Sequence, residues 1–190
     1  MIAVISTSSP RVSVALISDS GAVVSSGTDP AKRQASEVAI RLLNEQLDQA
    51  QLSLKDVAAY APDVGPGSFT GVRVGVTLCK MLAYAFDRQI VPVTAFDLIS
   101  PAEPVAIHCK RDEYFLRIPQ SQPTITTDKP ESCVGYGGDL GEQLLPDAAN
   151  FARVMESLQE INPALVVPLY IAEPSISTPK RDMGLGGTGV

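Results

Sequence analysis

The stretch "DVGPGSFTGVRVGVTLCK", Asp63 to Lys80, decides the fold. It places three glycines and one proline within seven residues, Gly65 to Gly71, and continues into a stretch of helical character. A glycine-rich turn before a helix occurs in phosphate-binding motifs and also in loops that only reverse the chain. The sequence therefore poses one question first: whether this loop holds phosphate or positions a helix.

Neither common phosphate motif fits the loop. A P-loop ends in Gly-Lys-Ser/Thr, whereas the last glycine here is followed by Val72 and Arg73. A dinucleotide fingerprint has the spacing GxGxxG after a first strand, whereas this loop reads GxGxxxG after a fourth expected strand. We therefore interpret it as a tight turn followed by a capped helix, and the free amides at the helix start leave an anion site as an alternative. The predicted turn and cap residues are Gly65, Pro66, Gly67, Ser68, Thr70 and Gly71.

The first hundred residues show an alternation typical of an α/β protein. Three short β-rich runs are separated by Ser-Ser-Pro and Asp-Ser-Gly, which predicts an antiparallel meander. Helical periodicity and short apolar runs then predict the order β-β-β-α-β-α-β. The expected elements are strands at 2–6, 11–18 and 22–27, a helix at 33–51, a strand at 56–61, a helix at 70–86 and a strand at 90–93.

After Pro101 the pattern restarts as a shortened copy of the first half. We predict strands at 104–110, 113–118 and 123–127, a short strand with a glycine loop at 132–140, and a helix marked by apolar residues from Phe151 to Ile161. The chain is accordingly divided into a first lobe, residues 1–100, and a reduced second lobe, residues 101–190, that ends in a flexible tail.

Composition excludes several function classes. The 190 residues are 45% hydrophobic, no apolar run approaches the roughly 20 residues that cross a bilayer, and the N-terminus lacks a signal-peptide pattern, so we expect a cytoplasmic protein. Three scattered cysteines argue against disulfides and zinc, and His108 as the single histidine argues against a Ser/His/Asp triad. The net charge is −6, with 12 acidic and 7 basic residues after position 100, which disfavours nucleic-acid binding by this chain alone.

The helix at 70–86 has an unusual outer surface, because it contains no Asp, Glu, Asn or Gln. Such a surface is typical of a subunit contact, and the alternative is a core helix with two snorkelling cations. On the helix at 33–51, an apolar ridge lies away from the expected core stripe of Ala39, Ile40, Leu43, Leu47 and Ala50, and we expect it to be half exposed. The predicted partner-binding residues are Val38, Leu42 and Glu45 on the first helix, and Arg73, Val76, Thr77, Lys80 and Tyr84 on the second.

With the meander and "GPGSFTGVRVGVTLCKMLA" in hand, the chain resembles the bacterial TsaB (YeaZ) family, the non-catalytic paralogues of the TsaD threonylcarbamoyltransferase. The resemblance covers residues 1 to about 100 and returns at "PLYI" (168–171). It implies an actin-like ATPase (ASKHA) fold with a β-meander and helices in each of two lobes. It also implies a cytoplasmic scaffold subunit in the synthesis of threonylcarbamoyladenosine (t6A) on tRNA.

The same resemblance implies the partners. These are a TsaD-type catalytic paralogue, a TsaE-type ATPase, and a second copy when the chain is alone; tRNA is contacted only through the complex, and no membrane is involved. No cofactor is expected on the chain itself, and ATP with magnesium enters only through the partner complex.

Two features depart from the family pattern. The first turn reads Ser6-Thr7-Ser8 where the family has an aspartate, and Ala35-Ser36-Glu37 replaces a His-Ser-Glu helix start. The chain is also short for the family. These departures favour a non-catalytic subunit over the alternative, an active small-molecule kinase or ATPase of the same fold. A hydrolase acting through Ser68 ranks lower, because the sequence shows no evident base for it.

Overall fold

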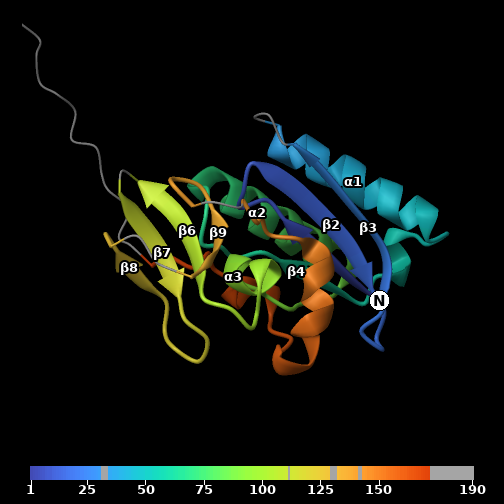
Figure 1. The fold of residues 1–190 in the computed structure, drawn as a ribbon. Helices are drawn as coiled ribbons and strands as arrows, with labels where there is room; N and C mark the ends of the chain where they lie inside the picture. Colours follow the sequence, from blue (N-terminus) through green and yellow to red (C-terminus); the bar gives the residue numbers. More distant parts are fainter. Residues whose placement is uncertain (31–33, 111, 129–131, 141–142, 172–190) are drawn as a thin grey trace, which may run out of the picture.

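The computed structural model describes residues 1–30, 34–110, 112–128, 132–140 and 143–171, and Figure 1 shows two sheets side by side. The predicted flexible tail after residue 172 lies outside the described residues.

The first sheet has five strands in the order β3-β2-β1-β4-β5. Its first three strands form the predicted antiparallel meander, and β4 and β5 run parallel to β1 because a helix precedes each of them. The predicted strand at 90–93 is shorter than expected, with a single bridge from Asp63 to Val93 beyond it. The elements are β1 (Ile2–Ser6), β2 (Arg11–Ile17), β3 (Val23–Pro30), α1 (Ala35–Gln49), η1 (Leu54–Asp56), β4 (Ala59–Pro62), α2 (Phe69–Phe86) and β5 (Gln89–Ile90).

The second sheet repeats this plan with four strands in the order β8-β7-β6-β9. Three antiparallel strands come first, and the fourth pairs in parallel with the first of them, as β4 pairs with β1. A short helix that the sequence did not predict, α3 (Ala95–Ile99), joins the sheets. The strands are β6 (Val105–Lys110), β7 (Glu113–Arg117), β8 (Thr124–Thr126) and β9 (Val134–Tyr136).

The predicted α-helix from Phe151 to Ile161 is wrong. The segment forms the 3-10 turns η2 (Ala148–Arg153) and η3 (Met155–Ser157), followed by η4 (Pro163–Leu165). Its apolar residues recur every three positions (148, 151, 154 and then 155, 158, 161), which matches the three residues per turn of a 3-10 helix. The apolar spacing therefore indicates a helical segment, but one with 3-10 geometry and not an α-helix.

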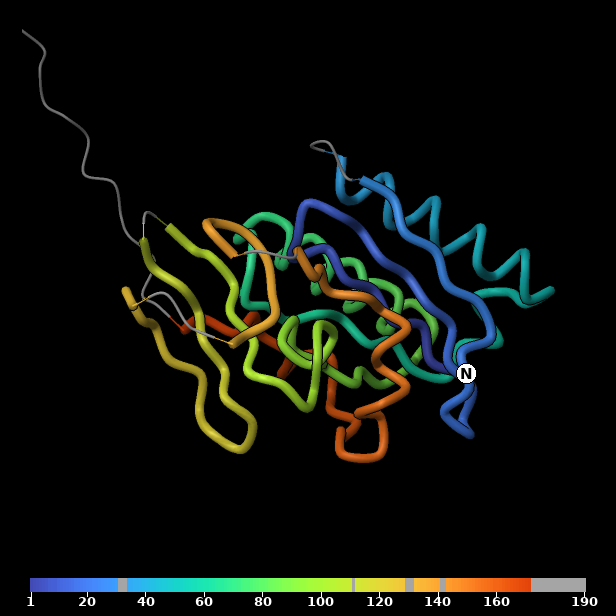
Figure 2. The backbone as a smooth tube through the Cα atoms, in the orientation of Figure 1, coloured from blue at the N-terminus to red at the C-terminus, as the bar shows by residue number. Residues whose placement is uncertain are grey.

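The first sheet is covered on both faces. Helices α1 and α2 pack on one face, where Ile5, Val14 and Tyr60 are buried, and η2 and α3 pack on the other against Val4 and Ala15. In Figure 2 the orange part of the tube returns from the second sheet to the first. Residues 147–169 thus pack on the first sheet, while the division of the chain into lobes at residue 100 stays a prediction.

Helix α1 is rotated relative to the prediction. Its buried residues are Ala39, Leu42, Leu43, Gln46 and Leu47. Leu42 is only 3% exposed, so the expectation that it is half exposed is wrong, and Ile40, expected in the core, is exposed. The reason is tertiary: the helix turns Leu42 and Gln46 toward Gly27 of β3, a strand that offers no side chain at that point.

Among the described residues, helix α2 has the length and the apolar composition that would allow it to cross a bilayer. Six of its residues are buried against the first sheet, so we describe it as a core helix with one outer surface.

Candidate functional site

The glycine loop packs directly against the turn between β1 and β2. A Cβ added at Gly67 would lie 2.3 Å from the carbonyl oxygen of Ser8, and one added at Gly71 would lie 2.0 Å from that of Thr7. Both distances are far below van der Waals contact, so only glycine lets the start of α2 approach the turn this closely. At least these two glycines therefore serve chain packing.

Hydrogen bonds hold the loop and the turn together. The Ser68 amide donates to the Ser8 carbonyl at 2.7 Å, and the Thr7 hydroxyl donates to the Gly71 carbonyl at 2.7 Å. Ser68 is the N-cap of α2, since its hydroxyl accepts the Gly71 N–H at 3.2 Å, and Thr70 lies within the first turn. The peptide between Gly65 and Pro66 is cis. The loop thus fixes where α2 begins and how it is directed.

A buried carboxylate lies beneath the loop. Asp63, at the end of β4, is fully buried and accepts hydrogen bonds from the hydroxyls of Ser6 at 2.7 Å and Ser8 at 2.5 Å, and from the amide of Gly65 at 2.8 Å. Burial raises the pKa of Asp63 to about 6, and these hydrogen bonds oppose the rise. Sequence reasoning missed this residue, although an aspartate between a buried strand and Gly-Pro was the available signal.

The turn does not fit a magnesium-bound phosphate. The Ser8 carbonyl accepts both the Ser68 amide and the hydroxyl of Tyr136, and the Thr7 hydroxyl is bonded to α2. The acidic residue nearby, Asp63, has both carboxylate oxygens occupied by donors of the protein itself. Within the part of the chain that the structure describes, no group of three or more His, Cys, Asp or Glu side chains is placed to hold a metal ion.

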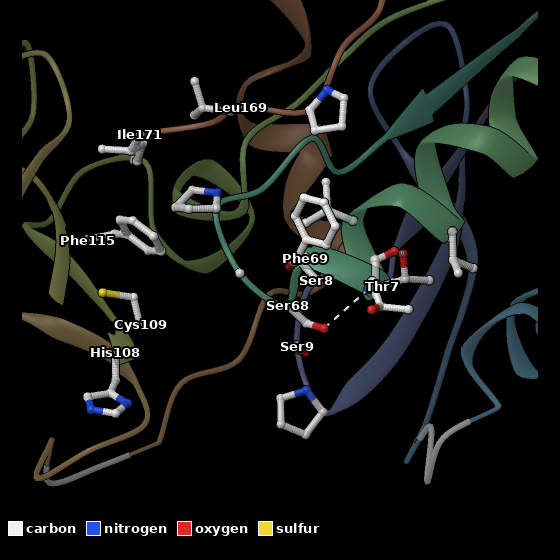
Figure 3. Close-up of a pocket in the computed structure, with 18 of the residues that line it drawn as sticks. Thr7, Ser8, Ser9, Ser68, Phe69, His108, Cys109, Phe115, Leu169 and Ile171 are labelled. Atoms are coloured by element: carbon white, nitrogen blue, oxygen red, sulfur yellow. Dashed lines mark hydrogen bonds between the residues drawn. The ribbon is translucent and has the colours of Figure 1, made fainter. Parts of the chain in front are cut away.

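A cleft of about 1110 Å³ opens between the two sheets (Figure 3). Its first wall carries Ser68 and Phe69, and its second wall carries His108 and Phe115. Ser68 and His108 come from opposite walls in Figure 3, and the Ser68 hydroxyl already caps α2. This geometry gives no support to the hydrolase alternative.

The outer surface of α2 is where the predicted partner residues are brought together. Arg73 and Thr77 are exposed, and Tyr84 is 88% exposed. Two large apolar residues that the site prediction omitted, Phe69 and Met81, are exposed beside them, and the Arg73 guanidinium lies 5.2 Å from the centre of the Phe69 ring. We call Arg73, Thr77, Met81 and Tyr84 the α2 stripe.

Two predicted partner residues of α2 lie elsewhere. Val76 is 4% exposed and belongs to the core, because it faces the sheet beside Val72 and Cys79. Lys80 is half buried, and its ammonium group donates to the carbonyl of Val166 at 3.0 Å. The exposed surface of α2 is therefore narrower than predicted, because Val76 is buried and Lys80 is half buried.

The ridge of Val38 and Leu42 lies away from α2. Leu42 faces β3, whereas the flank of α1 near the C-terminal end of α2 carries Asn44, Leu47 and Asp48. Ile40 lies one turn before Asn44 on that flank and is exposed. The predicted Glu45 accepts a hydrogen bond from Arg41 at 2.7 Å on the outer side of α1.

Along the other flank of α2 runs the C-terminal segment of residues 161–171. Ile161 pairs with Ile90, just beyond the end of α2; the Val166 carbonyl meets Lys80; and Tyr170 lies 6.0 Å from Phe69 at the helix start. The segment is thus antiparallel to α2. The sequence offered only one signal for it, the run "PLYI".

Comparisons with known proteins agree with this geometry. Residues 25–105 match the family model described as TsaD, tRNA N6-adenosine threonylcarbamoyltransferase. Over 61 residues the chain is 39% identical to the tRNA N6-adenosine threonylcarbamoyltransferase of Sulfurisphaera tokodaii, a match of 32% of this chain and 18% of that one. Residues 25–105 are thus similar to the TsaD domain.

The particular relatives are TsaB and YeaZ. The chain is 30% identical over 96 residues to the tRNA threonylcarbamoyladenosine biosynthesis protein TsaB of Bacillus subtilis, which covers 50% of this chain and 42% of that one. Two solved structures share the fold at 21% sequence identity. YeaZ from Pseudomonas aeruginosa aligns with a TM-score of 0.71 over 89% of this chain and 98% of that one. A protein from the same organism, described as similar to peptidase YEAZ, aligns with a TM-score of 0.74 over 90% of this chain and 99% of that one.

The predicted resemblance to TsaB (YeaZ) and the predicted fold class are confirmed by these matches. The chain spans less than half the length of the curated relatives described here.

Proposed function

We propose that this protein is a non-catalytic scaffold subunit in the synthesis of t6A on tRNA, and that it binds and supports a TsaD-type catalytic paralogue. The observation that carries the proposal is the α2 stripe: an exposed helix surface of aromatic, Met and Arg side chains, directed by a loop that is locked to the first sheet. Such side chains are enriched where proteins contact one another.

The absence of bond chemistry in this subunit is part of the proposal. The turn where related ATPases hold metal or phosphate is closed by Ser68 and Tyr136, which supports a subunit that uses no nucleotide itself. ATP and magnesium then enter through the partner complex, with a TsaE-type ATPase as a further component. The tRNA is contacted through the complex, since this chain is acidic overall, and the assembly works in the cytoplasm.

The proposed contact consists of the α2 stripe with Lys80, and of Ile40 on α1. Val76 lies beneath the α2 stripe in the core, whereas Leu42 is buried against β3 and is not part of the proposed contact. Self-association of the chain in the absence of the paralogue is proposed to use the same surface.

The test is a titration of the purified TsaD-type paralogue of the same organism with this chain, followed by calorimetry. Tyr84→Glu places a charge in the α2 stripe and should weaken binding at least tenfold, because a desolvated aromatic contact is replaced by a carboxylate. Ile118→Glu, at an exposed apolar position that follows β7 of the second sheet, is the control and should bind like the parent. Equal affinities for parent and Tyr84→Glu would show that the α2 stripe is not the contact.

A further inference from the structure

The segment of residues 161–171, "INPALVVPLYI", contains no charged residue and presents apolar side chains to solvent. Leu165 is 71% exposed and Val167 is 68% exposed, while Val166 between them is buried in the core beside α2. Leu165 ends the 3-10 turn η4 and the backbone is extended at Val166, so one buried side chain separates two that face outward. We call Leu165, Val167 and Tyr170 the C-terminal strip.

The C-terminal strip and the α2 stripe are joined into one surface. The Lys80 ammonium donates to the Val166 carbonyl, and the tilted ring of Tyr170 lies beside Phe69, which also contacts Arg73. The antiparallel course keeps the two beside each other along the whole helix. An outward apolar row of this length beside an apolar helix surface is larger than the single exposed apolar residues that are normal on proteins.

The strip is also held in place before any partner arrives. Pro163 and Pro168 restrict the backbone on either side of Leu165 and Val167. The Leu169 amide donates to the Val64 carbonyl at 2.8 Å, which ties the segment to the end of β4. A surface that is already ordered loses less entropy when it binds.

The charges of this surface select the kind of partner. From Phe69 to Phe86 the helix carries Arg73 and Lys80 and no acidic residue, and the nearest carboxylate along the chain is Asp87, past the helix end. A second copy would bring the same two cations to the contact, with no carboxylate from either α2 to offset them. A partner surface with carboxylates among apolar side chains fits better.

We infer that the partner of the proposed function covers the C-terminal strip together with the α2 stripe, through a surface that presents carboxylates among apolar side chains. This inference rests on the proposed function, and it adds residues 163–171 to the contact. The occupant in the complex is the TsaD-type paralogue, and a second copy of this chain covers the same surface more weakly and only in the absence of the paralogue.

The experiment compares three variants of the full chain against the purified paralogue by calorimetry, with circular dichroism as a check of folding. The double variant Leu165→Glu/Val167→Glu should weaken binding about 30-fold or more, because it places two charges in a desolvated apolar row. Tyr84→Glu reports on the α2 stripe, and Ile118→Glu is the control. Both strip residues are largely exposed, so the double variant should stay folded.

The outcomes separate the inference from the proposal on which it rests. Loss of affinity in both Tyr84→Glu and the strip variant supports the two together. Loss in Tyr84→Glu alone keeps the proposed function and overturns the inference about the strip. If Tyr84→Glu and the strip variant both bind the paralogue with the affinity of the parent, the proposed function and the inference about the strip are both wrong.

Two further readouts test the chemistry of the occupant. Arg73→Glu should weaken binding of the paralogue more than Arg73→Gln does, because it repels carboxylates instead of only losing a cation. Sedimentation of this chain alone tests the other occupant. If the strip variant abolishes self-association and leaves affinity for the paralogue unchanged, the strip is a contact between two copies and the inference is wrong.

Discussion

Helices α1 and α2 cover the same face of the first sheet, yet their outer surfaces differ in kind. The outer side of α1 carries charged residues, and its Arg41 is bonded to both Glu45 and Asp29 at 2.7 Å. The outer side of α2 carries Met81, Tyr84 and a single exposed cation, Arg73. Both helices bury an apolar face, so the folding of the sheet explains only their inner sides. The comparison teaches that the outer surface of α2 needs a reason other than stability.

The largest expected effect is a difference in the free energy of unfolding between substitutions at two positions of α1, residues 42 and 40. Leu42→Glu places a charge in the core between α1 and β3, so we expect it to lower the free energy of unfolding by more than about 4 kcal/mol. Ile40→Glu, two residues earlier and exposed, should change it by less than about 0.5 kcal/mol. Urea denaturation measures both. Similar stability of the two variants would mean that α1 is not rotated as described.

The second prediction concerns the loop that directs α2. Gly71→Ala should lower the free energy of unfolding by about 2 to 3 kcal/mol, because its Cβ meets the Thr7 carbonyl. In an unobstructed helix the same change would stabilise by about 1 kcal/mol. Thr77→Ala on the exposed side of α2 is the matched control, and thermal unfolding decides the sign. A stabilised Gly71→Ala would contradict the close packing of α2 on the turn.

The third prediction uses the pH dependence of Asp63. Its folded pKa, about 6, lies above the ordinary aspartate value of 3.8, so between these pH values the folded state keeps a proton that the unfolded state releases. The contribution of Asp63 to stability is therefore full below about pH 4 and is lost as pH rises through 6, a loss of about 3 kcal/mol.

Asp63→Asn has no carboxyl group at this position. Its free energy of unfolding relative to that of the parent should therefore rise by this amount between pH 4 and pH 7. Parallel stability curves for the two proteins, measured by denaturation at several pH values, would count against a buried carboxyl with a raised pKa.

The smallest effect on folding is expected in the α2 stripe, where substitutions should weaken binding instead. The double variant Met81→Ala/Tyr84→Ala should leave the free energy of unfolding within about 0.5 kcal/mol of the parent, since both side chains are mostly in solvent. The same variant should weaken binding of the paralogue. A strongly destabilised protein would show that the α2 stripe belongs to the core and would remove the basis of the comparison.

Local sequence patterns were enough for much of the architecture. The meander at residues 2–27, the helix starting at the glycine loop and the restart after Pro101 are all signalled by turn residues and apolar periodicity, which act over a few neighbours. The interpretation of Gly65 to Gly71 as a tight turn before a helix followed in the same way, since the P-loop and dinucleotide spacings are absent from the sequence itself.

Only the tertiary structure decided which side of each element faces what. Leu42 and Ile40 are two residues apart on one helix, and the position of β3 determines that the first is buried and the second exposed. Gly71 is required because Thr7, sixty-four residues earlier, lies against it, and Asp63 becomes buried only when Ser6 and Ser8 close over it. The C-terminal strip lies beside α2 through contacts between residues about a hundred positions apart, and no local pattern carries such information because these contacts depend on the path of the whole chain.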